Sequence, residues 1–559
     1  MIQKIFNSKK IRLIITAIHV ILTFLWARRV FNNVGDIPMG TAAINDFIGK
    51  RAEIVMTYII TEAFAIILIY FFWRLIFGIV SSFKKEYIIF LSIFLAGAVF
   101  IGLMWPDCIY WIGGAFDDNV ITYADAVRLT PDYWHSIYHS VIYGASLLFF
   151  PADFMIPLVQ YGLFVYVISY IFFRVKNVSG KKRWFVFLIF LLPATIELMC
   201  YGHRIMYYTL FAVLYMTYIW FDIEEGKERS VAEDIKLALL GSFLVVYRSE
   251  GIIIGILLYG IYVIFQGKRK VKRILLGIAV FALMMAAFKL PQKVGDIKYY
   301  GKDYQMVNTC NRLRAVFNSE DRVLNYEGAA KDMVAISDVM PVHLITQYGE
   351  DGYRRYNNKV RGYADINQTG LDETKSGNYL NAYRNILLHN PEIMKKYIVD
   401  SVYYATTGGK LYYLDSYLGT DYELPKWTCN AWDAGRDEMY GNGLTLRWSN
   451  LTSKIGLYEK VKSGHQWIMD FMKKMRIILY GMGVLILVNL FIFIRGLILT
   501  VKTKEKEHIG KGFIALSLIA LLIGTILTMP DALTYYFIIS AYLMICALYF
   551  SFCVKKKNN

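Results

Sequence analysis

Long apolar runs constrain this chain more than any other feature of its sequence. They extend over roughly 17 to 27 residues, the length that a helix needs to cross a hydrocarbon core about 30 Å thick. Such runs exclude a soluble enzyme, a disordered chain and a disulfide scaffold. They predict an all-α polytopic membrane protein with about twelve transmembrane helices, at 12–27, 54–80, 88–105, 155–174, 184–200, 206–222, 236–248, 250–266, 273–290, 475–500, 513–529 and 534–553.

The net charge of +17 predicts how these helices are oriented. If the N-terminus is inside, the cytoplasmic segments carry 26 basic and 9 acidic residues, whereas the rest of the chain carries 35 of each. Cytoplasmic loops of membrane proteins are enriched in Lys and Arg, so the whole excess is explained by topology and nucleic acid is not expected as a partner. We expect a multi-pass protein of the cell membrane with both termini in the cytoplasm. The cytoplasmic segments are 1–12, 84–86, 174–183, 222–236, 267–273, 502–511 and 555–557.

Two apolar segments are too short for ordinary spans. Residues 138–150 precede Pro151 and Asp153, and reading them as a full span would put the basic segment 174–183 outside. We therefore predict an interfacial or half-inserted helix on the outer side. The second segment, 236–266, is interrupted by Arg248-Ser249-Glu250 and forms either two crossings or a re-entrant pair.

The predicted spans divide the chain into four parts. Residues 1–87 hold two N-terminal helices, 88–290 the main membrane core, 291–474 an extracytoplasmic domain, and 475–559 three helices and a basic tail. The outer domain is expected to be mixed but mainly helical, and Asn390-Pro391 separates two of its helices. Its predicted helices are near 304–316, 379–389, 392–405 and 454–470.

Some residues of the outer domain admit two interpretations. Three tryptophans could stack on sugar rings or pack in the core of the domain, and core packing is the more common role of such residues. Cys310 and Cys429 could form a disulfide or remain two thiols, and no spacing typical of a metal site is present. The tryptophans are Trp427, Trp432 and Trp448.

The outer segment 106–137 is acidic where the rest of the outside is neutral. Five aspartates oppose the single Arg128, and Asp117 and Asp118 are adjacent after Gly113-Gly114. One interpretation is a helix start, where acidic residues favour the dipole. The other is a general base, or a ligand of Mg²⁺ or Mn²⁺, because two neighbouring carboxylates raise one pKa. Asp107 is a further candidate for the base.

Further ionisable residues lie at outer helix ends. His135 and His139 share a face if the segment is helical, where they could form interfacial hydrogen bonds or bind a metal or phosphate. Charges near lipid pair with one another or face a cavity. Arg248 could therefore pair with Glu250, and Arg204 with Glu197. Alternatively, both arginines could bind the phosphate of a lipid head group, for which the planar guanidinium is well suited.

The order of these features resembles the GT-C superfamily of membrane glycosyltransferases, in particular bacterial relatives of the protein O-mannosyltransferase and aminoarabinose transferase type. The resemblance lies in Trp105-Pro106-Asp107, the acidic outer loop, the short helix 138–150 and Tyr247-Arg248-Ser249-Glu250-Gly251. It implies that Asp117 or Asp118 activates the acceptor or helps to bind a cation. It also makes Arg204 and Arg248 candidates for binding the phosphate of the donor. The further predicted substrate-binding residues are Arg128, His135, His139 and Glu250.

The expected function is transfer of a sugar from a polyprenyl-phosphate donor to a cell-envelope acceptor on the outer face. The partners are then the lipid-linked donor and membrane lipids. A polysaccharide polymerase, a transporter or flippase of lipid-linked glycans, and a non-catalytic protein with the same fold are the alternatives. A transporter predicts ionisable residues near the middle of the membrane, and Glu62 and Arg74 are the exceptions that fit it.

Overall fold

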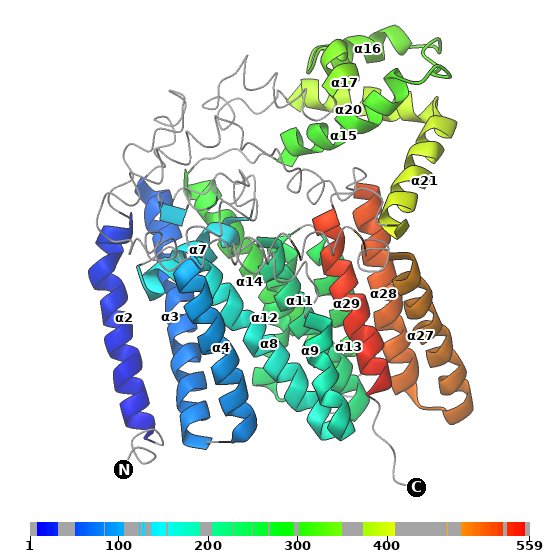
Figure 1. The fold of residues 1–559 in the computed structure, drawn as a ribbon. Coiled ribbons are helices and arrows are strands. Elements are labelled where there is room, and N and C mark those ends of the chain that lie inside the picture. Colours follow the sequence, from blue (N-terminus) through cyan, green and yellow to red (C-terminus); the bar gives the residue numbers. More distant parts are fainter. Residues whose placement is uncertain are drawn as a thin grey trace.

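The computed structural model describes a helical bundle and a smaller helical domain at one end of it (Figure 1). No strand occurs among the described residues, which are 8–31, 51–82, 84–104, 122, 126–127, 129, 136–151, 155–190, 204–226, 228–248, 250–265, 269–295, 301–348, 373–407, 467, 474, 482–528 and 534–553.

Most long helices of the bundle run antiparallel to the one before, although α8 and α11 run in the same direction, and α2 begins and α29 ends on the same side (Figure 1). We call this side the termini end and the opposite side the domain end. The helices are α2 (Lys9–Phe31), α3 (Arg51–Ser82), α4 (Lys85–Met104), α7 (Ile137–Phe149), α8 (Met155–Ser179), η2 (Gly180–Phe185), α9 (Val186–Phe190), α11 (Arg204–Glu225), α12 (Val231–Tyr247), the π-helix η3 (Ile252–Leu257), α13 (Leu258–Phe265), α14 (Lys270–Gly295), α27 (Met482–Thr503), α28 (Lys506–Thr528) and α29 (Thr534–Phe552).

The bundle has the character of an all-α, multi-pass membrane protein. Within the described residues, six helices are long and apolar enough to cross a membrane. Their outward faces carry exposed apolar side chains such as Leu25, Leu275 and Leu487, which suits contact with lipid. The total of twelve crossings stays a prediction. The six segments are Lys9–Ala27, Ala52–Ser81, Met155–Lys176, Lys270–Leu290, Met482–Thr503 and Lys506–Ile526.

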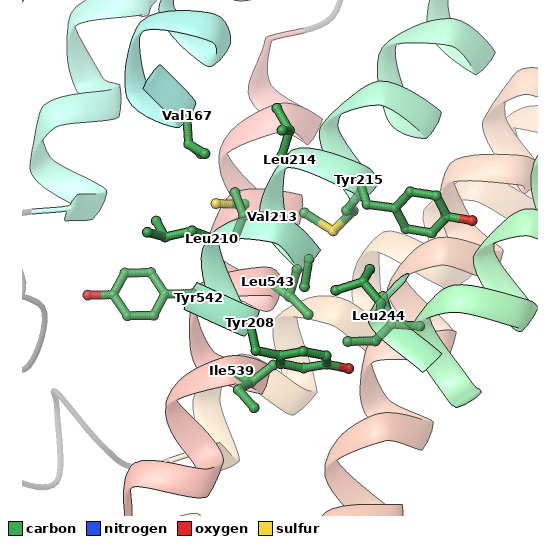
Figure 2. Packing of buried hydrophobic residues seen from close by; sticks show 14 of the residues in the cluster. Val167, Tyr208, Leu210, Val213, Leu214, Tyr215, Leu244, Ile539, Tyr542 and Leu543 are labelled. Carbon is green, nitrogen blue, oxygen red and sulfur yellow. The ribbon is translucent and has the colours of Figure 1, made fainter. Parts of the chain in front are cut away.

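Helix α11 lies at the centre of the bundle. Its residues from Arg204 to Ile223 are buried on almost every side, as expected for a helix that is apolar around its whole circumference. Figure 2 shows its side chains packed against α8, α12 and α29, with Val167, Leu244 and Leu543 among the neighbours. Helices α8, α12, α13, α28 and α29 therefore share α11 as a common neighbour.

The predicted short helix at 138–150 forms α7, which is buried in protein along nearly its whole length. Ser136 caps its first turn by accepting from the Tyr138 amide. At its other end, the Nε1–H of Trp26 donates to the Leu148 carbonyl over 2.6 Å, and His19 Nε2 lies 2.8 Å from the Phe149 carbonyl oxygen. Thirteen residues extend only about 20 Å, which is too short for a crossing.

Buried ion pairs join the helices at the termini end. Asp222 of α11 binds both Arg174 of α8 and Arg229 of the next loop. Asp234 of α12 accepts from the Tyr262 hydroxyl over 2.6 Å and from Arg273 Nε over 3.0 Å. The segments 174–183, 222–236 and 267–273, which the sequence assigns to one side of the membrane, thus lie together.

Two further charged pairs lie at the termini end, and the Lys176–Glu86 pair is the more exposed of them. Lys176 donates to Glu86 over 2.7 Å, and this hydrogen bond lowers the pKa of that carboxyl below its ordinary value. Lys511 of α28 pairs with Glu224 of α11, which brings the segment 502–511 to the same side.

The helical domain comprises α15 (Gly301–Phe317), α16 (Ala329–Ser337), α17 (Val342–Tyr348), α20 (Glu373–Leu388) and α21 (Pro391–Thr407). It has its own apolar core, which includes Leu313, Ile336 and Ile386. Cys310 is buried in this core, whereas Cys429 and the three tryptophans lie outside the described residues. The break between α20 and α21 falls at Asn390, as predicted.

The side chain of Asn390 also binds the backbone of the loop at Val323, next to the break between α20 and α21. Its side chain accepts from the Val323 amide over 2.7 Å and donates to the Val323 carbonyl over 3.1 Å. The same amide group donates to the Ile386 carbonyl at the end of α20 over 2.7 Å. Because Asn390 is buried, these bonds replace water and fix the angle at which α21 leaves the domain.

We expect Asp234→Asn to lower the free energy of unfolding by about 3–5 kcal/mol, because the buried Arg273 would keep its charge without the opposing carboxylate. Denaturant titration of the protein in detergent micelles measures the change. Glu392→Gln is the control, since its ion pair with Lys395 is exposed and should be worth about 0–1 kcal/mol. Equal effects of the two variants would contradict the structural role of the buried pair.

Candidate functional site

Ionisable and aromatic side chains from three helices meet at the domain end of the bundle. They come from the first turn of α7, the first two turns of α11, and the end of α12 with the turn that follows it. All of them are buried or nearly so. We call them the Arg–Tyr cluster, which consists of His139, Arg204, Tyr208, Tyr247, Arg248 and Glu250.

Two tyrosine rings form the centre of the Arg–Tyr cluster. The rings of Tyr208 and Tyr247 are nearly parallel, with centroids 6.0 Å apart. The ring of His139 meets that of Tyr247 edge-on at 4.2 Å, and the Arg248 guanidinium carbon lies 6.0 Å from the Tyr208 centroid. Because the face of an aromatic ring carries partial negative charge, this arrangement favours a cation at Arg248.

Arg248 and Glu250 form the ion pair that the sequence leaves open. Arg248 donates from Nε to one carboxylate oxygen over 3.2 Å and from Nη2 to the other over 2.8 Å. This is the two-pronged geometry in which a guanidinium binds a carboxylate or a phosphate. Glu250 therefore holds the guanidinium of Arg248 in one orientation.

The backbone of the turn after α12 places this pair. Arg248 ends α12 in an extended conformation, and the Gly251 amide then donates to the Arg248 carbonyl over 3.0 Å. The chain returns at once in η3, so that the Gly251 α-carbon lies against the end of α12. A Cβ at position 251 would lie 1.8 Å from the Leu244 carbonyl oxygen, so glycine is required there.

The two tyrosine hydroxyls have different environments. That of Tyr247 donates to the Arg204 carbonyl over 3.2 Å and so links α12 to α11. That of Tyr208 is fully buried and has no hydrogen-bond partner among the residues that the structure describes. Figure 2 shows Tyr208 packed near Leu244 and Ile539. A buried hydroxyl without a partner costs about 1–3 kcal/mol, which a polar ligand would offset.

The structure brings together four of the eight residues predicted for the site: His139, Arg204, Arg248 and Glu250. The other four lie outside the described residues, namely Asp117, Asp118, Arg128 and His135. The expected Mg²⁺ or Mn²⁺ site rests on two of these. Among the described residues no group of three His, Cys, Asp or Glu side chains could hold a metal ion.

Sequence reasoning missed Tyr208 and Tyr247 as members of the cluster. Tyr208 follows Arg204 by four residues and therefore lies on the same face of α11, and Tyr247 directly precedes Arg248. These spacings were the available signal. They are weak in a chain with 43 tyrosines.

Comparisons with known proteins add no family assignment. No protein-family model, no curated protein and no solved structure matches the chain. The likeness to GT-C enzymes therefore rests on the short motifs of the sequence, and the chemistry of the Arg–Tyr cluster has to support any function.

We expect Gly251→Ala to destabilise the protein by about 1–3 kcal/mol, because the added methyl group overlaps the Leu244 carbonyl and displaces the turn. Thermal unfolding in detergent, followed by the loss of monodisperse protein, measures the effect. Gly260→Ala in α13 is the matched control, since nothing lies within 4 Å of its added Cβ and a helical alanine is favoured. A Gly251→Ala variant as stable as Gly260→Ala would show that the turn tolerates displacement.

Proposed function

We propose that this chain is a membrane glycosyltransferase that takes a sugar from a polyprenyl-phosphate donor and passes it to an acceptor at the domain end. The observation that carries the proposal is the Arg–Tyr cluster. It holds two arginines buried between apolar helices, where a charged side chain is costly and commonly serves a polar ligand.

Charge supports the orientation that this reaction needs. The basic segments gather at the termini end, so the positive-inside rule assigns that end to the cytoplasm. The Arg–Tyr cluster and the helical domain then face outward. The phosphate of a lipid-linked donor lies at the membrane surface, which is the level at which α11 and α12 present Arg204 and Arg248.

The reaction is a substitution at the anomeric carbon of the donor sugar. The acceptor oxygen forms a bond to this carbon while the bond from the carbon to the phosphate oxygen breaks. The bonding electrons leave with the phosphate, whose added negative charge the guanidinium groups of Arg204 and Arg248 would stabilise. Asp117 or Asp118 would accept the proton of the acceptor hydroxyl.

The residues around Arg204 and Arg248 suit an anionic ligand. Glu250 orients Arg248, the Tyr208 ring lies beside its guanidinium, and the Tyr208 hydroxyl is available as a donor to a phosphate oxygen.

One observation favours a second candidate, a non-catalytic membrane protein with the same fold. The two-pronged bond to Glu250 already occupies the geometry in which Arg248 would bind phosphate. A purely structural pair predicts that activity does not depend on Arg248 and that only stability falls when it is removed. Variants of Arg204 and of the loop aspartates separate the two candidates.

We expect Asp117→Asn or Asp118→Asn to reduce transfer by about 10²–10⁴-fold, the usual contribution of a general base. Arg204→Ala should reduce transfer by about tenfold or more, since a charge-assisted contact to phosphate is worth about 1.5–3 kcal/mol. The assay uses membranes that contain the full chain and a panel of labelled polyprenyl-phosphate sugars. Arg384→Ala, an exposed position on α20, is the control and should retain full activity.

Unaltered turnover of both aspartate variants would contradict the assignment of Asp117 or Asp118 as the general base. Unaltered turnover of Arg204→Ala would remove the proposed donor site. If labelled sugar crosses the membrane without covalent transfer, the chain is a transporter instead.

A further inference from the structure

Helix α21 connects the core of the helical domain to the bundle. Its first half packs on that core through Ile393 and Met394, and the helix also contacts α27 and α28. Figure 1 shows it descending from the domain so that its C-terminal end reaches the domain end of these two helices. The second half of α21 is therefore close to the level at which the bundle leaves the membrane.

This second half exposes apolar side chains on one face. Val399 is 58% exposed and Tyr403 59%, and Ile398 and Val402 are exposed as well. With 100° between successive residues, the four side chains cover an arc of about 140°. Ile393 and Tyr397 lie on the other side of the helix and Met394 lies at the border beside Ile398, so the exposed face is largely separate from the one that packs on the domain core. A water-soluble domain rarely leaves such an apolar face in water.

We infer that the C-terminal half of α21 inserts its apolar face into the outer leaflet of the membrane that holds the bundle. The main argument is continuity with the lipid-facing surface of α27, which α21 contacts. Val484, Leu487 and Phe491 of α27 are all more than 60% exposed, although they are apolar. The exposed face of α21 extends this apolar surface toward the helical domain.

The lysines of α21 fit a lipid surface, whereas its carboxylates are Glu392, which pairs with Lys395, and the exposed Asp400 beside the apolar face. Lys395 lies above the middle of the apolar face, about 4.5 Å along the axis from Ile398 and about 12 Å from Tyr403. Each interfacial layer of a bilayer is about 5–8 Å thick, so Lys395 reaches phosphate groups while the apolar side chains reach the acyl boundary. Lys396 lies at the edge of the same face.

The proposed contact gives the helical domain a second attachment to the membrane. Its first attachment is through the chain itself and through the packing of α21 on α27 and α28. Insertion of α21 would hold the helical domain at a constant height above the Arg–Tyr cluster. This inference does not depend on the proposed glycosyltransferase activity.

Photocrosslinking of the full chain in phosphatidylglycerol-containing vesicles tests the contact. A genetically encoded photoreactive residue replaces Val399 or Val402, and mass spectrometry detects lipid adducts after illumination. Leu487 on α27 is the positive control. Lys331 on α16 and Glu392, an exposed position two turns nearer the domain on α21, are the negative controls.

We expect lipid adducts at positions 399 and 402 that are as abundant as those at 487. We expect no lipid adducts at 392 and 331. All five altered positions are exposed, so the fold should persist, and an unchanged gel-filtration profile confirms it. Absence of lipid at 399 and 402 while 487 is labelled would overturn the inference. A crosslink between two copies of the chain at 399 would also overturn it, because the face would then be a protein interface.

Discussion

Helix α11 carries a buried arginine near its first residue and a buried aspartate near its last, and the bundle is arranged around these two ends. Arg204 and Asp222 are about 27 Å apart along the helix axis, close to the thickness of a hydrocarbon core. Between them α11 is apolar on every side, so it must be enclosed by other helices. At one end Asp222 gathers arginines from neighbouring segments, and at the other Arg204 belongs to the Arg–Tyr cluster.

The two ends of α11 differ in the polar groups that lie around them. At the termini end, the buried carboxylates of Asp222 and Asp234 each bind arginine, which is the arrangement expected of a structural network. At the domain end, the cluster has two arginines and one glutamate, together with a hydroxyl that lacks a partner among the described residues. A buried hydroxyl that has no partner among the described residues is more useful for binding an anion than for stability.

Much of the fold follows from the sequence, because the length of an apolar run determines whether a helix crosses a membrane. The positions of the six candidate spans and the break at Asn390 were predictable for this reason. The pairing of Arg248 with Glu250 was one of two alternatives that the sequence left open, since two residues separated by one position meet only in a particular turn, and that turn depends on Gly251. The exposed face of α21 could not be separated from its core face, because both are apolar. Asp117 and Asp118 lie outside the described residues, so the predicted base stays a prediction.

The hydrogen bonds at the end of α7 bear on the order in which the protein is made. The last carbonyl groups of this short helix are buried, and lipid could not satisfy them. Trp26 and His19 of α2 are the groups that do so, and Trp73 of α3 in turn donates to His19 over 3.1 Å. Both helices precede α7 in the chain, so they are synthesised before it. The first two helices thus serve as a template for the helix that carries His139, and a shortened chain that began at α4 would lack the partners that α7 needs to fold.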